Sequence, residues 1–77
     1  MTLKQLQIID TIKAYSSIND CDRVFVTLLD SDYQTLELKA IVELSDGDCK
    51  YFTVGEYSFE ESEQAFQDFE TLKRIFD

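Results

Sequence analysis

The sequence has no histidine, proline or tryptophan, and it contains only two glycines and two cysteines. Without histidine, a general base would have to be a carboxylate whose pKa is raised in a pocket, and a domain of 77 residues has little room for one. Two cysteines are too few for a disulfide scaffold. We therefore expect a protein that is not an enzyme, with no catalytic residue and no cofactor.

Long apolar runs are also missing. None approaches the roughly 20 residues that a membrane-spanning helix needs. Met1 leads directly into a polar helix start instead of the apolar segment of a signal peptide. We therefore expect a cytoplasmic protein, acting in the host cytoplasm if a phage encodes it.

Positive charge is scarce, because seven Lys and Arg stand against sixteen Asp and Glu and leave a formal charge of −9. Such a surface repels nucleic acids and anionic lipids, so the preferred partner is a basic surface of a protein. A simpler interpretation is that acidity keeps a small domain soluble, for which a net charge of about 2 to 8 is ordinary. Both interpretations stay open.

The apolar content of 44%, with four tyrosines and six phenylalanines, is too high for a disordered acidic tail. Residues 1–77 are expected to form one acidic α+β domain of the order α-β-β-β-α. Capping boxes at Thr2–Gln5 and Ser58–Glu61 predict the two helix starts. The predicted buried stripes are Leu6, Ile9 and Ile12 in the first helix, and Ala65, Phe66, Phe69, Leu72 and Phe76 in the second.

Three strands are predicted over 23–29, 35–44 and 49–56, forming an antiparallel meander with the second strand central and both helices on one face. Alternation in the second strand places Leu36, Leu38, Ala40, Val42 and Leu44 on the core side.

Side-chain parity selects the turns. A three-residue loop, Ser45-Asp46-Gly47 with Gly47 left-handed, pairs Ala40 with Phe52 and Leu38 with Val54. This register assembles one apolar face, which a two-residue loop would not do. Across the first turn we expect Leu28 to pair with Leu36.

The opposite face of the sheet is expected to be uncovered. It carries Phe25, Ile41 and Tyr51, together with Leu29 and Thr53, among the charged residues Glu37, Lys39 and Glu43. Mixed apolar and charged residues on an open sheet are typical of a binding or dimerisation surface. Scattered apolar residues are also ordinary on protein surfaces.

The expected topology gathers carboxylates at two ends of the molecule. One end holds Asp30, Asp32, Glu56, Glu60, Glu61 and Glu63, and the other holds Asp20, Asp22, Asp46, Asp48 and Asp77. Glu60, Glu63 and Glu70 line one exposed ridge of the second helix, interrupted by Arg74. A row of carboxylates imitates phosphates to a basic groove, although turns and helix starts favour Asp and Glu for local reasons as well.

No metal site is expected, because neither Asp30-Ser31-Asp32 nor Asp46-Gly47-Asp48 continues into a calcium-binding loop. The expected register places Cys21 and Cys49 beside Glu43 on opposite edges of the sheet. Two strand spacings are about 9 to 10 Å, beyond the reach of a disulfide, so we expect free and mostly buried thiols.

In size and acidity the chain resembles small inhibitor proteins, namely phage anti-CRISPR and anti-restriction proteins and bacterial toxin-immunity proteins. This resemblance is one of composition and implies an inhibitor that docks on a basic, nucleic-acid-binding surface, in one form as a DNA mimic. The predicted contact residues are Asp30, Asp32, Glu56, Glu60, Glu61, Glu63, Glu70, Phe25, Ile41 and Tyr51. The alternatives are a toxin-immunity protein, or a structural or regulatory module that joins a second copy or a larger complex through the open sheet face.

Overall fold

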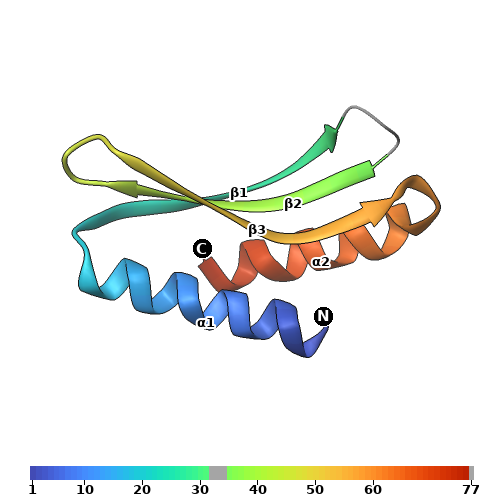
Figure 1. Ribbon diagram of the computed structural model, residues 1–77, viewed down its shortest axis with the longest axis horizontal. Coiled ribbons are helices and arrows are strands. Elements are labelled where there is room, and N and C mark those ends of the chain that lie inside the picture. The colour runs from blue at the N-terminus through green and yellow to red at the C-terminus, as the bar shows by residue number, and fades with distance from the viewer. Residues whose placement is uncertain (32–34, 77) are drawn as a thin grey trace.

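A computed structural model describes residues 1–31 and 35–76 of the chain. In chain order the elements are α1 (Leu3–Ile18), β1 (Cys21–Ser31), β2 (Thr35–Leu44), β3 (Cys49–Ser58), the short 3-10 helix η1 (Phe59–Glu61) and α2 (Ser62–Phe76). The three strands form one antiparallel sheet in the order β1-β2-β3 (Figure 1). The predicted α+β meander is confirmed.

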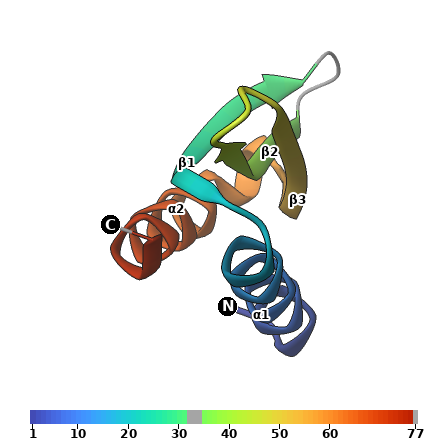
Figure 2. The same cartoon turned by 90° about the vertical axis from the view of Figure 1, so that its left-hand side faces the viewer.

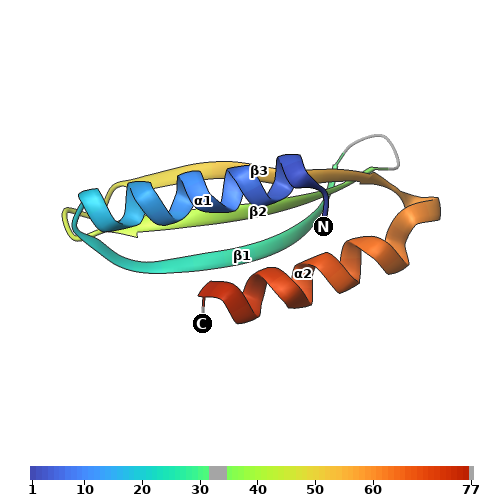
Figure 3. The ribbon, with the colours of Figure 1, turned by 90° about the horizontal axis from the view of Figure 1, so that it is seen from below.

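Both helices lie on the same side of the sheet (Figure 2). Seen from below, α1 runs along β3 and β2, whereas α2 runs along the outer side of β1 (Figure 3). The other face of the sheet has no helix over it in the described part of the chain. The predicted two-layer arrangement is therefore confirmed, and it leaves one sheet face open.

The core lies between β2 and the two helices. Leu38, Ala40 and Val42 of β2 are fully buried, as are Ile12 of α1 and Leu72 of α2. Burial of one Val, Leu or Ile side chain stabilises the fold by about 1.5 to 3 kcal/mol, so the buried residues of β2 contribute strongly to the core.

The turn between β2 and β3 is the predicted three-residue loop. The Leu44 amide donates to the Asp48 carbonyl over 2.8 Å, and the Gly47 amide donates to the Leu44 carbonyl over 3.0 Å. Gly47 has a φ of 93°, a left-handed conformation that glycine adopts without strain. Ala40 pairs with Phe52, as parity required.

Further along β3 the predicted pairing is wrong. Leu38 lies opposite Gly55 and not Val54, because the register shifts by one residue between Leu38 and Lys39. Val54 is the extra residue of a β-bulge and is still buried. The bulge brings Tyr57, opposite Leu36, onto the core side.

The predicted pairing of Leu28 with Leu36 is also wrong, because Leu28 lies opposite Leu38. A shift of two residues preserves which side chains face the core. The assignment of faces is therefore correct although the register is not.

Both predicted capping boxes are present, at Thr2 with Gln5 and at Ser58 with Glu61. The helix stripes need two corrections. Leu6 is 46% exposed and Phe66 is 58% exposed, whereas Gln5 and Asp68 are buried. Each helix is therefore oriented so that one polar side chain enters the interior.

Candidate protein-binding surface

The open face of the sheet carries an apolar row that crosses all three strands. Phe25 lies opposite Ile41, and Ile41 lies opposite Tyr51. Tyr51 is 63% exposed and Phe25 is 37% exposed. Partly exposed aromatic side chains beside an aliphatic one are the usual composition of the centre of a protein interface.

Ion pairs border this row. Arg23 lies opposite Glu43, with 3.5 Å between Nε and Oε1, and its guanidinium stands 4.3 Å from the centre of the Phe25 ring. Lys39 Nζ lies 3.1 Å from Glu37 Oε2. Exposed ion pairs add little stability, but these ones balance charge beside the apolar row.

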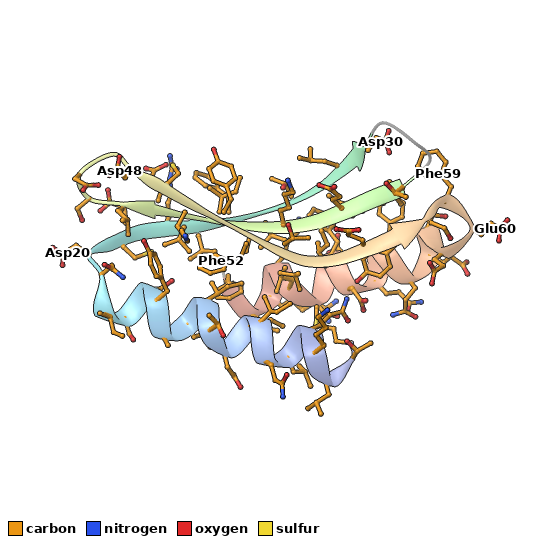
Figure 4. All side chains as sticks on the ribbon, viewed as in Figure 1. Asp20, Asp30, Asp48, Phe52, Phe59 and Glu60 are labelled. Atoms are coloured by element: carbon orange, nitrogen blue, oxygen red, sulfur yellow. The ribbon has the colours of Figure 1, made fainter. Side chains whose placement is uncertain are left out.

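Carboxylates follow at one end of the sheet. Glu37 pairs with Leu29 of β1 and with Glu56 of β3. The Glu56 side chain therefore lies on the open face, at the end of the sheet where the carboxylates gather. Asp30 and Glu60 lie at this same end of the molecule (Figure 4). The structure therefore places part of the predicted acidic end next to the open face.

The remaining predicted residues are only partly brought together. Glu61 of η1 and Glu63 in the first turn of α2 are exposed, and Glu61 Oε1 accepts from the Ser58 amide over 3.0 Å. Glu70 is exposed but lies seven residues beyond Glu63, about 10 Å along the helix. Asp32 lies outside the described residues.

Asp20 and Asp48 lie at the opposite end (Figure 4). Two aspartates at this end accept hydrogen bonds from the turn between β2 and β3: Asp46 Oδ1 accepts from the Asp48 amide over 2.9 Å, and Asp22 Oδ1 of β1 accepts from Ser45 Oγ over 3.2 Å. Asp77 lies outside the described residues. Hydrogen bonds within the fold therefore account for aspartates at this end, whereas they account for only part of the carboxylates at the end with Asp30 and Glu60.

Most of the negative charge is uncompensated at contact distance. Among residues 1–31 and 35–76, the carboxylates within 4.0 Å of a cationic group are those of Glu37, Glu43 and Asp68. The exposed carboxylates of the acidic end and of the α2 ridge therefore project their charge into solvent.

A buried polar cluster joins three elements, and the sequence did not predict it. Gln5 Nε2 of α1 donates to Tyr57 Oη of β3 over 2.7 Å, and Tyr57 Oη donates to Asp68 Oδ2 of α2 over 2.6 Å. Gln64 Nε2 donates to Asp68 Oδ1 over 2.9 Å, and the amino group of Met1 lies 3.8 Å from the same oxygen. The one available signal was Asp68 itself, a charged residue placed between stripe positions Ala65 and Leu72.

Burial, together with the hydrogen bond to the Asp68 carboxylate, raises the pKa of Tyr57 to about 12. Tyr57 is therefore protonated at neutral pH and serves as a hydrogen-bond donor. We interpret the cluster as a structural connection that holds both helices against the sheet.

Replacement of Gly55 by alanine is expected to disturb this cluster. A Cβ at Gly55 would lie 2.5 Å from Gln5 Nε2 and 2.8 Å from Tyr57 Oη, which are already bonded to each other. Overpacking of this kind costs about 1 to 3 kcal/mol. Urea unfolding of Gly55→Ala should show this loss, and the double variant Gly55→Ala, Gln5→Ala should lose less than the sum of its parts; strict additivity would contradict the proposed collision.

Both cysteines are free thiols, as expected. Cys49 pairs with Glu43 as predicted, but Cys21 pairs with Leu44, and Cys49 is exposed instead of buried. The position of Cys49 at the start of the edge strand β3 leaves its side chain on the open face.

The part of the chain that the structure describes contains no cluster of three or more metal-ligating side chains and no helix suited to crossing a membrane.

Comparisons with protein-family models, with curated proteins and with solved structures gave no match to this chain.

Proposed function

We propose that this protein is a small acidic inhibitor that docks on a basic, nucleic-acid-binding surface of a target protein. The observation that carries the proposal is the set of exposed carboxylates without an ion-pair partner, next to the apolar row of the open face. A basic groove provides the complementary charge, and the protein itself would repel nucleic acid.

The two parts of the surface have different tasks in this proposal. Phe25, Ile41 and Tyr51 supply the apolar contact that holds the complex together. Glu56, together with Asp30 and Glu60 at the same end of the molecule, attracts the basic partner and speeds association.

The finer form of the proposal is mimicry of nucleic acid, as in anti-CRISPR or anti-restriction inhibitors encoded by phages. It is supported by the ridge that continues from η1 into α2, where Glu60, Glu63 and Glu70 are all exposed. Double-stranded DNA presents about one charge per 1.7 Å of axis, so three carboxylates imitate only a short stretch of it.

The test begins with capture of a partner from a host lysate and continues with measured association rates. Between about 0.05 and 0.5 M salt the rate should fall at least tenfold, because screening removes electrostatic steering. Glu60→Gln with Glu63→Gln should slow association more than the matched pair Asp46→Asn with Asp48→Asn at the other end. Association rates that change neither with salt concentration nor with these substitutions would contradict acidic docking.

A second candidate function is that of a structural or regulatory module in a larger complex. It is favoured by the balanced charges around the apolar row, which suit a neutral partner surface. In the same measurements, binding that does not change with salt concentration but is lost in Tyr51→Glu would identify this second function.

A further inference from the structure

The two edge strands of the sheet differ in how they are protected. β3 has a bulge at Val54 and exposed charges at Lys50 and Glu56, which are devices that prevent a sheet edge from pairing with another chain. β1 has its irregularity only at its start, between Cys21 and Arg23. From 24 to 29 it reads Val-Phe-Val-Thr-Leu-Leu, with neither charge nor proline.

The side chains of β1 are incompletely covered on both faces. On the core side, Val24, Val26 and Leu28 are only partly buried, whereas their partners on β2 are fully buried. On the open side, Phe25 and Leu29 are 37% and 49% exposed. The outer backbone groups of β1 have no strand partner among the described residues.

Helix α2 extends the apolar surface beside this edge. It runs beneath β1 and past its outer side (Figures 2 and 3). Phe66 lies two residues, or about 200°, from Asp68 around the helix. Because Asp68 is turned toward Tyr57 and α1, Phe66 is turned away from α1, toward the side of the free edge, and is 58% exposed.

We propose that β1 pairs antiparallel with β1 of a second copy of this chain, about a two-fold axis through Thr27, to form one continuous six-stranded sheet. An axis perpendicular to the sheet keeps all four helices on one side, and it requires that paired residues face the same side. The added strand would lie over the exposed side of α2 and cover Phe66. This pairing does not depend on the proposed inhibitory target.

The register follows from the residues. With the axis at Thr27, Phe25 meets Leu29 of the second copy on the open side, and Val26 meets Leu28 on the core side. An axis at Val26 would instead place Asp22 opposite Asp30, which is unfavourable because like charges repel. Axes at Thr27 and at Leu28 both place Asp30 opposite a half-buried valine, Val24 and Val26 respectively. The axis at Thr27 keeps Asp30 farther from the centre of the interface and pairs the two Thr27 side chains.

The Thr27 side chain suits a position on the proposed two-fold axis. Its hydroxyl oxygen is buried and has no hydrogen-bond partner in the described structure. Cross-strand threonine pairs form hydrogen bonds with each other, so the pairing gives this hydroxyl a partner after rotation of its side chain. The uncharged stretch also keeps the carboxylates of the two copies away from the centre of the interface.

Sedimentation tests the pairing with the full chain at about 0.15 M salt, where repulsion beyond roughly 8 Å is screened. We expect the mass to rise from the 9.0 kDa of one chain to twice that value with concentration. Thr27→Lys, which sets two like charges against each other at the axis, should raise the dissociation constant at least tenfold while circular dichroism is unchanged. A wild type that is monomeric at every concentration would overturn the proposal, as would a Thr27→Lys variant that dimerises normally.

Cross-linking tests the register and does not depend on the lysine variant folding. In a background of Cys21→Ser and Cys49→Ser, Thr27→Cys should form a covalent dimer under mild oxidation, because residues paired at the axis lie within the roughly 7 Å that a disulfide spans. Leu29→Cys, which meets Phe25, and Tyr51→Cys on the open face should not. Cross-linking through Tyr51→Cys but not Thr27→Cys would show face-to-face packing and overturn edge pairing.

Discussion

Replacement of Asp68 by alanine is expected to lower the free energy of unfolding by about 3 to 5 kcal/mol, since it removes one partner from a buried, charged hydrogen-bond cluster. Without Asp68 the Tyr57 hydroxyl loses its acceptor, and the helices α1 and α2 lose their common connection to β3. A chain of 77 residues has a total stability of about 4 to 10 kcal/mol, at roughly 0.05 to 0.15 kcal/mol per residue. The variant should therefore be close to unfolding.

Urea unfolding followed by circular dichroism measures this loss. Asp10→Ala is the matched control, because Asp10 is also a helical aspartate but is exposed. Surface substitutions of this kind change stability by about 0.5 kcal/mol or less. Equal stabilities of the two variants would show that the cluster does not hold the helices in place.

Stability is expected to fall by about 2 to 3 kcal/mol as the pH rises from 10 to 12, through the titration of Tyr57, whose pKa is raised from 10.0 to about 12. The folded state holds this proton more tightly than the unfolded state does. The stabilisation is therefore complete below pH 10, the unfolded value, and is lost as the pH passes the folded value of about 12.

Substitution by phenylalanine isolates this contribution from other groups that titrate at alkaline pH. The stability difference between wild type and Tyr57→Phe should shrink between pH 10 and 12. If the Tyr57→Phe difference does not change up to pH 12, the hydroxyl is not buried against a carboxylate.

This cluster also bears on the proposed docking surface. Asp68 holds α2 in place, and α2 with η1 carries Glu60, Glu63 and Glu70. Tyr57 lies next to Glu56 on β3, with the two side chains on opposite faces of the sheet. Loss of the cluster should therefore displace the acidic end as well as reduce stability.

Features that depend on neighbours in sequence were predictable. Each capping box links residues three positions apart, so Thr2 with Gln5 and Ser58 with Glu61 could be recognised directly. The alternation of β2 identified the core face, and Gly47 identified the loop, because both are local properties of the backbone. The open row of Phe25, Ile41 and Tyr51 followed from the same parity.

Features that depend on distant contacts were decided only by the tertiary structure. The pairing of Leu28 with Leu38 differs from the prediction by two residues, a change that alternation cannot detect because it leaves every side chain on its face. The bulge at Val54 brings Tyr57 onto the core side, where it bonds residues 52 and 11 positions away in sequence. These long-range bonds rotate the helices so that Gln5 and Asp68 are buried while Leu6 and Phe66 are exposed. The sequence alone therefore determined the elements, their order and the core face of the sheet. The register and the buried faces of the helices required the whole fold, because they depend on hydrogen bonds between residues far apart in the sequence.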